Sequence, residues 1–494
     1  MMKFRRVLIL NRGEIACRLI QACQELGLET VAIYSDVDKG ARHIELADDS
    51  IHLPGSSPKE TYLNLNAILP AAKKKGCDAV HPGYGFLSER AQAAEAFTEA
   101  GLCWIGPSAK SIRMLGDKLE AKRLLDKYGV PTTPWGEADP KNGGALSALA
   151  EKIGYPVLLK AASGGGGKGM RLVKTAKELH EAAESAAREA QSSFGDATLL
   201  LEKFVEQPRH IEIQILGDNY GNVIHFGERE CSLQRRHQKV LEEAPAPNLS
   251  QKAKDAIAQS ALQLAQGVGY SNAGTVEFLV DKDENFYFLE VNSRLQVEHS
   301  VTESVWGVDL VHAQIRIAQG EKISALFPDR AERKPRGHSI QARIYAEDAS
   351  AGFSPCPGTL ALVEWPQAVG LRVDTGVRTG STIGLDYDAM IAKLTVSAET
   401  RERALDRLLW CLRHTVIFGT VTNINYLQDV LTLPEVKSGR MHVKLLETAL
   451  ASWKDSPPEE LLAQHSTLLA GAGSMARSAS GSAKQANPSP WERG

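Results

Sequence analysis

Short apolar runs alternate with helical spacing over the first 115 residues of the chain. Val7–Leu10 and Thr30–Tyr34 are mostly apolar runs, which is typical of buried strands. Between them, apolar residues recur every three or four positions, at Ala16, Leu19, Ile20 and Cys23. A strand, a helix and a second strand in this order predict a parallel sheet with covering helices. The intervening turn reads Asn-Arg-Gly-Glu, without the three glycines of a dinucleotide-binding turn, so a hydride-transferring enzyme is not expected.

A glycine-rich segment separates two predicted strands in the next part of the chain, residues 116 to 330. The apolar run Tyr155–Lys160 precedes Gly164–Gly169, in which five of six residues are glycine, and Arg171–Val173 follows. Without Cβ atoms, backbone N–H groups can approach and surround phosphate oxygens. The spacing and the terminal Lys-Ser/Thr of a Walker-type loop are missing. We therefore predict a mobile glycine-rich lid between two strands.

The third part of the chain mixes short strands with helices. Thr359–Val363 is predicted to be a strand, and Arg401–Arg413 a helix. Beyond about residue 455 the chain is rich in serine, alanine and glycine, which predicts a disordered tail over 455–494. The predicted fold class is α/β, with an α+β mixture after the first parallel sheet. The predicted domains are residues 1–115, 116–330 and 335–445.

Two carboxylates and an amide are expected to converge on one hairpin in the middle domain. Thr275–Val280 and Phe286–Val291 are predicted strands, joined by a turn-rich segment. If the loop holds only residues 283 and 284, Glu277 lies opposite Glu290, about 5 Å away, and Asn292 projects from the same face. Such oxygen ligands suit Mg²⁺, which usually keeps ligand positions for substrate phosphates. A solvated hairpin with an acidic face explains this pattern, taken alone, equally well.

A cationic cluster accompanies this hairpin. From Gln234 to Lys239, six polar or cationic residues follow one another, whereas a plain surface strand would alternate with apolar residues. Downstream, Arg294, Gln296 and Glu298 offer an anion clamp, a polar contact and a possible base. Cations in excess beside a carboxylate cluster indicate a site for several negative charges, such as a nucleotide triphosphate and a second anion.

Composition narrows the class of protein further. The 494 residues carry a formal net charge of −3, which argues against non-specific binding to nucleic acid or to a membrane surface. Seven cysteines without a Cys-x-x-Cys pair predict neither a disulfide framework nor a zinc site, so a reducing cytoplasm is expected. The chain begins with a charged segment that leads straight into a strand, which is unlike a signal peptide.

Ten motifs in the same order resemble those of the biotin carboxylase family. They are NRGEIA, HPGYGFLSE, IGP, GDK, GGGGKGM, EKF, PRHIEIQ, CSLQRRHQKVLEEAPAP, EVNSRLQVEH and QARIYAED, over about residues 4 to 445. The resemblance implies three domains: an N-terminal parallel-sheet (pre-ATP-grasp) domain, an ATP-grasp domain with a glycine-rich lid, and a C-terminal biotin carboxylase domain.

The resemblance also implies roles for individual residues. The expected ATP-binding residues are Lys118, Lys160, Gly165, Gly166, Gly167, Gly169, Glu202, Lys203, His210, Gln234 and His237. The expected ligands of Mg²⁺ or Mn²⁺ are Glu277, Glu290 and Asn292. The expected bicarbonate and biotin pocket contains Lys239, Arg294, Gln296, Val297, Arg343, Tyr84 and Asp388, although ordinary packing explains the last two equally well. Catalysis is assigned to Lys239, Arg294, Arg343 and Glu298, with Glu298 as general base and Arg343 stabilising the biotin enolate.

Three positions depart from the family pattern. The family commonly has Met, Thr and Pro where Val291, Ser293 and Ser300 stand in this chain. The first two changes are expected to affect packing only. Because proline restricts the backbone, Ser300 is expected to loosen the chain after Glu298. No charged site residue departs, so activity is expected.

The implied activity is that of a biotin carboxylase. ATP phosphorylates bicarbonate to carboxyphosphate, and the CO₂ released is captured by the ureido nitrogen of biotin. The alternatives are another carboxyphosphate-forming ATP-grasp ligase, such as a carbamoyl-phosphate-forming half, or a silent nucleotide-binding regulatory subunit. Intact Glu298, Lys239 and Arg343 argue against the silent subunit. The final carboxyl acceptor is not readable, although Val373–Arg378 favours an acyl-CoA carboxylase α-subunit.

The expected partners are a separate biotin carboxyl carrier protein and a carboxyltransferase subunit, and the chain itself is expected to form a homodimer. In family members with a fused carrier, the biotinylated lysine lies in a Met-Lys-Met-like hairpin. Here the only Met-Lys pair is Met2-Lys3, and the region after residue 455 lacks the alternating apolar pattern of a carrier domain. We therefore expect biotin to arrive as a substrate on another protein.

Overall fold

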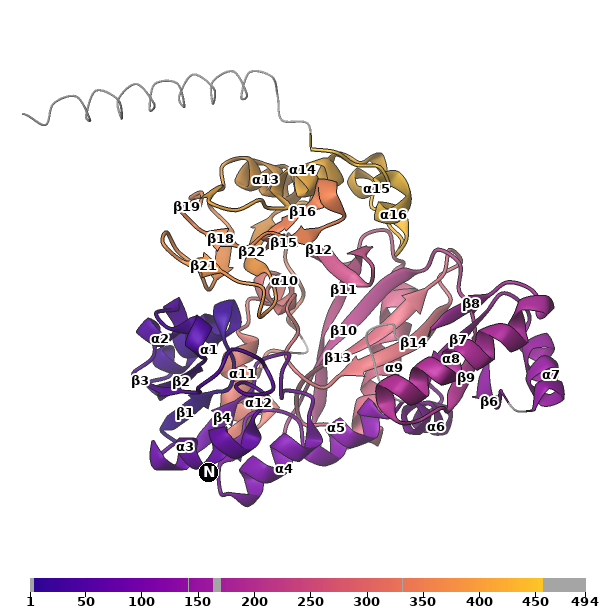
Figure 1. The fold of residues 1–494 in the computed structure, drawn as a ribbon, viewed down its shortest axis with the longest axis horizontal. Helices are drawn as coiled ribbons and strands as arrows, with labels where there is room; N and C mark the ends of the chain where they lie inside the picture. Colours follow the sequence, from indigo (N-terminus) through magenta and orange to yellow (C-terminus); the bar gives the residue numbers. More distant parts are fainter. Residues whose placement is uncertain (1–3, 141, 163–169, 331, 456–494) are drawn as a thin grey trace, which may run out of the picture. The chain divides into compact units, whose positions relative to one another are not determined.

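The first apolar runs form the five-stranded parallel sheet that their pattern predicts (Figure 1). The structure is a computed structural model, and it describes residues 4–140, 142–162, 170–330 and 332–455. The sheet has the order β3-β2-β1-β4-β5, and every neighbouring pair is parallel. The bounds of β1 to β5 are Arg6–Ile9, Glu29–Tyr34, Asp49–His52, Ala79–His81 and Cys103–Trp104.

Helices cover this sheet and lead to the next part of the chain. Helix α1 (Gly13–Glu25) buries the four residues at helical spacing completely, as their pattern predicts. The following helices are α2 (Arg42–Leu46), α3 (Leu65–Lys74), α4 (Ala91–Glu99), α5 (Ala109–Gly116) and α6 (Lys118–Tyr128). Because α1 begins just after β1, residues 11–14 lie at the carboxyl end of the parallel strands, where open α/β sheets bind ligands.

A smaller antiparallel sheet holds the two strands that flank the glycine-rich segment. Its order is β6-β9-β7-β8, and helices α7 (Gly143–Ile153) and α8 (Leu179–Phe194) share its apolar core. Its strands are β6 (Trp135–Ala138), β7 (Val157–Ala161), β8 (Arg171–Val173) and β9 (Leu199–Lys203). Both predicted flanking strands are confirmed, whereas the predicted lid, Gly164–Gly169, lies outside the described residues.

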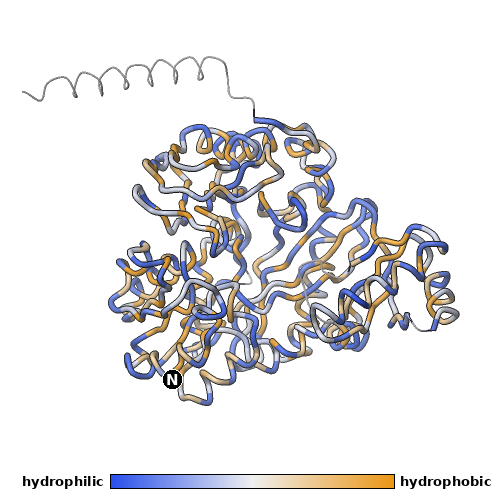
Figure 2. Tube along the Cα trace, viewed as in Figure 1, coloured by the Kyte–Doolittle hydropathy of each residue, from blue (hydrophilic) through white to orange (hydrophobic). Residues whose placement is uncertain are grey.

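The largest sheet has eight antiparallel strands and crosses the predicted boundary between the second and third domains. Its order is β14-β13-β10-β11-β12-β15-β22-β20. Strand β12 pairs with β15 around Leu241↔Ala342, so backbone hydrogen bonds join the two predicted domains. Hydrophobic residues recur along its strands (Figure 2). The strands are β10 (Arg209–Gly217), β11 (Val223–Arg235), β12 (Gln238–Ala244), β13 (Asn272–Val280), β14 (Phe286–Asn292), β15 (His338–Tyr345), β20 (Leu371–Thr375) and β22 (Met390–Ala398).

A shared apolar core ties the parallel sheet to the large sheet. It contains Leu19 of α1, Phe226 of β11 and Val301 of α10, all at most 1% exposed. The helices of this region are α9 (Gln251–Gly267), α10 (His299–Trp306), α11 (Leu310–Ala318) and α12 (Ile323–Leu326). Because residues from both sheets are buried together, their relative position is set by packing, and residues up to Ala451 form one unit.

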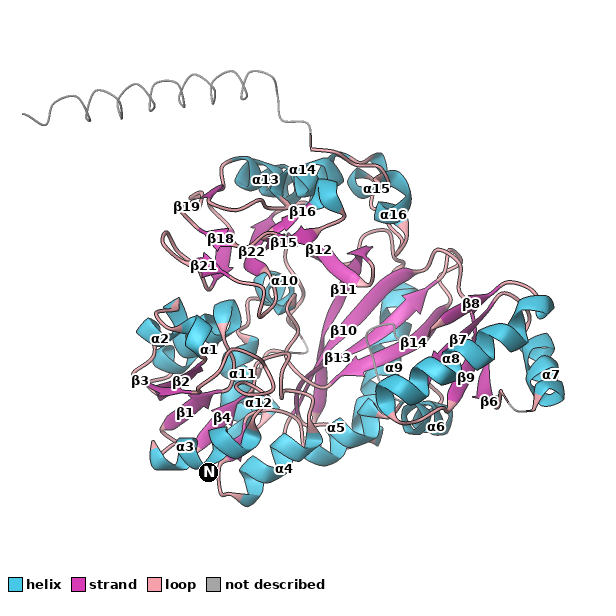
Figure 3. Ribbon diagram, viewed as in Figure 1, coloured by secondary structure: helices cyan, strands magenta, loops and turns pink. Residues whose placement is uncertain are grey.

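The last part of the unit combines short strands and helices, as predicted (Figure 3). The predicted helix is α13 (Arg401–Arg413). The single strand predicted at Thr359–Val363 is wrong, because the chain changes partner there and forms β18 (Gly358–Thr359) with β21 (Thr382–Ile383) and β19 (Leu362–Glu364) with β23 (Val416–Phe418). A hydrophobic pattern shows which side chains are buried but not which strand lies alongside. The remaining elements are β16 (Glu347–Asp348), β17 (Ser354–Pro355), α14 (Ile424–Thr432), α15 (Pro434–Lys437) and α16 (Leu445–Ala449).

Two sequence expectations concern features beyond these elements. Within the part of the chain that the structure describes, no helix has both the length and the apolar character needed to cross a membrane. The predicted tail lies, from residue 456 onward, outside the described residues.

Candidate functional site

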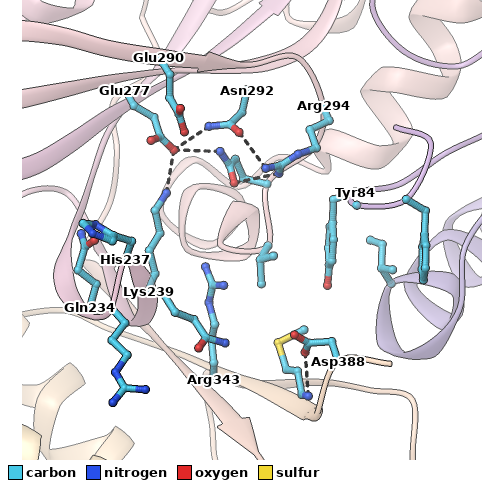
Figure 4. A pocket seen from close by; sticks show the side chains of 18 of the residues that line it. Tyr84, Gln234, His237, Lys239, Glu277, Glu290, Asn292, Arg294, Arg343 and Asp388 are labelled. Atoms are coloured by element: carbon cyan, nitrogen blue, oxygen red, sulfur yellow. Dashed lines mark hydrogen bonds and ion pairs between the residues drawn. The ribbon is translucent and has the colours of Figure 1, made fainter. Parts of the chain in front are cut away.

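One cavity of about 1070 Å³ collects most of the predicted site residues from all three parts of the chain (Figure 4). The N-terminal sheet contributes Tyr84, and the region of β15 to β22 contributes Arg343 and Asp388. The middle of the chain contributes Lys160, Glu202, His210, Gln234, His237, Lys239, Glu277, Glu290, Asn292, Arg294, Gln296 and Val297. In Figure 4, Glu277, Glu290 and Asn292 lie together at the top of the view, Tyr84 lies on the right, and Arg343 and Asp388 lie in the lower half.

The hairpin β13–β14 places Glu277 opposite Glu290, as predicted, but by a different route. The predicted two-residue loop is wrong, because the Asp281 N–H donates to the Asn285 carbonyl and leaves a three-residue loop. A β-bulge between Phe278 and the acidic pair then shifts the register by one residue and restores the opposition. Bulges re-aim side chains in this way beside functional sites. Glu290 and Asn292 consequently face the cavity together.

The electrostatics of this pair fit a hard cation. Burial opposes the charge of Glu277, but Lys239 and His210 outweigh it, so the pKa of Glu277 is lowered. Burial and the negative charge of Glu277 raise the pKa of Glu290. The Asn292 amide donates to Glu277 at 2.8 Å. Two carboxylates and an amide oxygen are a donor set that suits Mg²⁺ or Mn²⁺. A bound cation would offset the burial and the repulsion that disfavour the charged form of Glu290.

Lys239 is the hub of the site. Its ammonium contacts Glu212 at 2.6 Å, Glu277 at 2.9 Å and Glu298 at 2.6 Å. Burial would lower the pKa of Lys239, but the three carboxylates raise it well above its ordinary value. Arg229 is fully buried and forms an ion pair at 2.5 Å with Glu212, one of the carboxylates that contact Lys239. Lys239 therefore stays charged and presents a fixed cation to the cavity.

Glu298 lies behind the cavity wall and not in it. The side chain is fully buried, and its two oxygens bind Lys239 at 2.6 Å and Arg343 at 3.0 Å, both of which line the cavity. Burial and Glu212 oppose its charge, yet Lys239 and Arg343 prevail, so the pKa of Glu298 is lowered. The carboxylate is thus ionised and able to accept a proton.

Arg343 is itself held by a second carboxylate. Its Nε donates to Glu242 at 2.5 Å while the other end of the guanidinium binds Glu298. Burial and the nearby Glu298 outweigh the attraction of Arg343 and raise the pKa of Glu242 to about 7. A guanidinium bound by two carboxylates has a fixed orientation, which suits electrostatic stabilisation of an anion.

Arg294 closes the anion-binding wall next to the hairpin. Its guanidinium contacts Glu89 at 3.0 Å, the Asn292 side-chain oxygen at 2.8 Å and the Gln296 side-chain oxygen at 3.1 Å. These contacts orient the planar group, so its position does not depend on a ligand. Together with Lys239 it provides two cations for an anion in the cavity.

The expected nucleotide-binding residues divide into three groups. Lys160 and Lys122 both pair with buried Glu202, at 2.8 and 3.4 Å, and all three line the cavity. Lys203 instead donates to the carbonyls of Gly154 and Tyr155, at 2.9 Å each, and is absent from the lining. The side chain of Lys118, as well as Gly165, Gly166, Gly167 and Gly169, lies outside what the structure describes.

The cationic cluster forms a hairpin, although its residue types do not predict a turn. Arg235 pairs with Gln238, so Arg236 and His237 form a two-residue turn with φ of 47° and 66°. Left-handed turns of this kind usually contain glycine or asparagine, which neither position has. The turn brings His237 and Arg236 to the cavity, and such backbone strain is concentrated at functional sites.

Several residues of the site were missed by sequence reasoning. Glu212, Arg229 and Glu242 are at most 1% exposed; Glu212 contacts Lys239, Glu242 contacts Arg343, and Arg229 pairs with Glu212. The signal was available for Glu212, which shares a strand face with His210, two residues away. Glu242 and Arg229 gave no such signal, because their partners are distant in sequence.

The expectation for Ser300 is wrong. Its hydroxyl is fully buried and bonds to Gln341 at 2.6 Å and to Thr395 at 2.7 Å. The serine therefore ties the chain after Glu298 to β15 and β22 instead of loosening it.

Glu14, at the start of α1, yields a prediction about pH and stability. Burial, and secondarily Asp374, raise its pKa to about 7 against the opposing charge of Lys393. Because this folded pKa is above the ordinary value of 4.5, the stabilisation is present below pH 4.5 and is lost as the pH rises through 7. Glu14→Gln stays neutral, so its unfolding free energy relative to that of wild type should rise between pH 5 and pH 8, by roughly 1–3 kcal/mol. Urea unfolding at both values checks this; a difference that falls as the pH rises would contradict it.

Family models match three consecutive parts of the chain. They are described as "Biotin carboxylase, N-terminal domain" over residues 3–112, "Carbamoyl-phosphate synthase L chain, ATP binding domain" over 117–326, and "Biotin carboxylase C-terminal domain" over 341–448. Together they match most of the chain, in the order expected from the motifs.

Curated relatives and solved structures extend the likeness. The chain is 45% identical over 446 residues to a biotin carboxylase of Nostoc, covering 90% of this chain and 99% of the relative. It is 46% identical over 445 residues to the mitochondrial methylcrotonoyl-CoA carboxylase subunit alpha of Arabidopsis thaliana, covering 90% of this chain and 60% of the relative. The chain thus spans about three fifths of the length of such subunits.

Two solved structures share the fold over nearly the whole chain. One is the biotin carboxylase domain dimer of Hydrogenobacter thermophilus 2-oxoglutarate carboxylase, in complex with MgADP, ADP and bicarbonate. It has a TM-score of 0.87 at 43% identity and covers 92% of this chain and 100% of that one. The other is a biotin carboxylase–β-γ-ATP complex from Campylobacter jejuni, with a TM-score of 0.86 at 41% identity, covering 90% and 99%.

Proposed function

The chain belongs to the biotin carboxylase family, and on this premise we propose that it carboxylates biotin with ATP and bicarbonate. The observation that carries the proposal is the arrangement around Lys239. One cation contacts both Glu277 of the acidic hairpin and buried Glu298, and Glu298 in turn binds Arg343. A phosphate-binding end, an anion pocket and an enolate-stabilising cation thereby line one cavity, and the base behind its wall contacts Lys239 and Arg343 of that wall.

In the first half-reaction, bicarbonate attacks the terminal phosphate of ATP. We assign its binding to Lys239, Arg294, Gln296 and the backbone of Val297, all in the cavity wall. Glu298 accepts the proton of bicarbonate, which frees an oxygen to attack phosphorus, and ADP leaves. Carboxyphosphate forms by this step. Little covalent work is left to the protein, because phosphoryl transfer is accelerated mainly by positioning and charge neutralisation.

The nucleotide occupies the end of the cavity lined by Lys160, Glu202, His210, Gln234 and His237. Lys160 neutralises phosphate charge, and Glu202 keeps that ammonium in place. When bound, Mg²⁺ or Mn²⁺ at Glu277, Glu290 and Asn292 supplies further neutralisation of the phosphates. Lys203 does not line the cavity, and we assign it an indirect role: its ammonium donates to the Gly154 carbonyl and so fixes the backbone there.

In the second half-reaction, carboxyphosphate breaks down to CO₂ and phosphate, and biotin captures the CO₂. The released phosphate takes the proton of the ureido nitrogen of biotin, and that nitrogen forms the new bond to carbon. Arg343 stabilises the negative charge that develops on the ureido oxygen. Tyr84 and Asp388, which also line the cavity, are assigned to the wall that receives biotin.

The activity is tested by ATP cleavage in the purified chain. Cleavage that requires bicarbonate and Mg²⁺ and that free biotin stimulates, with carboxybiotin as product, is the expected result. A carbamoyl-phosphate-forming ligase is the second candidate, because the model over 117–326 is described by that chemistry. Ammonia-dependent formation of carbamoyl phosphate without carboxybiotin would favour it. A silent regulatory subunit would bind ATP without either reaction.

We further propose the partners and the setting of the reaction. Biotin is presented by a biotin carboxyl carrier protein, and a carboxyltransferase subunit passes the carboxyl group to an acyl-CoA. The likeness to subunits named methylcrotonoyl-CoA carboxylase alpha supports a branched acyl-CoA as acceptor. A homodimer is supported by the dimer of the 2-oxoglutarate carboxylase domain. The compartment proposed is the cytoplasm, while several relatives are named as mitochondrial or chloroplastic.

This 494-residue polypeptide is predicted to remain free of biotin. Its only Met-Lys pair is Met2-Lys3, whereas a biotinylated lysine is expected between methionines in a hairpin. Co-expression with an active biotin ligase, followed by avidin blotting and intact mass, measures this directly. A known carrier domain expressed alongside serves as the positive control. Stoichiometric biotin on the chain would overturn the carrier-in-trans proposal without affecting the proposed reaction.

A further inference from the structure

The backbone around Glu298 is held by strands that belong to the C-terminal part of the chain. The Lys393 ammonium donates to the Val297 carbonyl at 3.0 Å. Arg343 binds the carboxylate of Glu298 at 3.0 Å. Two residues further on, the Ser300 hydroxyl bonds to Gln341 of β15 and Thr395 of β22. The residues before, at and after the proposed base are therefore all anchored.

The four anchoring side chains share one face of the β15–β22 ladder. Gln341 lies directly opposite Thr395, and Arg343 lies directly opposite Lys393. Residues two apart on a strand project to the same side, so all four point toward the segment 297–300. Their exposed fractions are between 0% and 8%, so solvent does not compete with the contacts.

Lys393 is an unusual anchor because it is completely buried. Its charge is compensated by Glu14 at 3.2 Å and Asp374 at 3.9 Å, from the N-terminal part and from β20. Burying a charged lysine is costly unless it is paired. The ammonium also donates to the Val297 carbonyl, so the buried Lys393 holds the backbone of the residue directly before Glu298.

Ser300 provides the second anchor through a defined chain of donors. Its single hydroxyl hydrogen goes to the Gln341 side-chain oxygen, so the Thr395 hydroxyl donates to Ser300. The Gln341 amide then donates to Glu242 at 3.0 Å, and Glu242 holds Arg343. Because Arg343 binds Glu298, the chain of contacts closes on the proposed base.

We propose that this face of β15 and β22 positions Glu298, with Ser300 and Lys393 as positioning residues that do not touch substrate. The inference rests on the proposed function, since it concerns the base of that reaction. General-base work requires the acceptor within hydrogen-bond reach of the proton. Holding the backbone on both sides of Glu298, as well as its carboxylate, supplies that accuracy. The C-terminal strands thereby complete the site of the middle domain.

The test uses Ser300→Ala in the full chain, with Ser304→Ala as its matched control. Ser304 is an exposed residue on the same helix whose hydroxyl donates to the Ser300 carbonyl at 2.9 Å, so its removal changes a bond to Ser300 but none to β15 or β22. For Ser300→Ala we expect kcat/KM for bicarbonate in ATP cleavage to fall roughly tenfold, as small misplacements do. The KM for ATP should change less than about twofold, because the nucleotide contacts are untouched, and Ser304→Ala should match wild type in both.

A double-mutant cycle with Glu298→Gln separates positioning from general loosening. If Ser300 acts through the base, Ser300→Ala should change the residual rate of Glu298→Gln less than about twofold. Lys393→Met, provided it folds, should show the same loss alone and the same absence of a further loss in the Glu298→Gln background. Ser300→Ala removes one oxygen only, so the test does not depend on the lysine variant folding.

The outcomes distinguish this inference from the proposed function. A wild-type chain without bicarbonate-dependent ATP cleavage would overturn the function and, with it, the role of the anchors. An active wild type with an unaffected Ser300→Ala would overturn the positioning role alone. Equal losses in Ser300→Ala and Ser304→Ala, or a full tenfold loss added to that of Glu298→Gln, would reduce Ser300 to a packing residue.

Discussion

Glu298→Gln is expected to lower bicarbonate-dependent ATP cleavage by roughly 10²–10⁴-fold, the usual loss when a general base is removed. The substitution keeps the shape of the side chain, but its single oxygen can accept from only one of Lys239 and Arg343, which bind different oxygens of Glu298. It cannot take up the proton of bicarbonate. Initial-rate measurement of phosphate release at saturating ATP, Mg²⁺ and bicarbonate gives the size of the effect.

The control for this variant is nucleotide binding. The residues that line the nucleotide end do not contact Glu298, apart from the shared hub Lys239. The affinity for MgATP should therefore stay within about threefold of wild type, a difference below 1 kcal/mol. Near wild-type turnover would remove Glu298 from the role of base, whatever else the site does.

Arg343→Ala is expected to affect the second half-reaction most. Carboxylation of free biotin should fall by roughly 10²–10³-fold, the loss typical of a removed oxyanion-stabilising donor. Bicarbonate-dependent ATP cleavage should fall less, by roughly tenfold, because Arg343 also helps to orient Glu298. Both rates are measured on the same preparation, by carboxybiotin formation and by phosphate release.

A matched variant separates the lost cation from an unpaired charge. Arg343→Ala leaves Glu242 buried without its partner, whereas Arg343→Ala combined with Glu242→Gln removes that charge. Carboxylation should stay low in the double variant if the enolate needs the guanidinium. Recovery in the double variant, or equal losses in both assays for the single one, would contradict the assignment of Arg343.

Local pattern was sufficient for much of the fold. The buried strand β1, the helix α1 and the helix α13 follow from apolar spacing alone, because each buries one face against whatever packs on it. The three family-matched regions likewise follow the order of the motifs. The acidic pair Glu277 and Glu290 was also predictable, since both lie on one hairpin.

Turn chemistry and strand partners were less predictable. The turn at Arg236 and His237 has positive φ values but contains no glycine, so the local sequence does not predict it. The hairpin loop after Asp281 was assigned the wrong length, and a bulge compensated for the error. Both features depend on register, which neighbouring strands impose.

Sequence was enough to name many of the residues that line the cavity, because each motif is continuous along the chain and its chemistry is local. Long-range packing settled how they act on one another. Lys239 meets three carboxylates from three other segments, and Glu298 is fully buried and bound by Lys239 and Arg343. Lys393 and Ser300 gained their contacts only when β22 packed beside the segment 297–300. Ion pairs and hydrogen bonds depend on distance in space, and the residues that make these contacts are up to 96 positions apart.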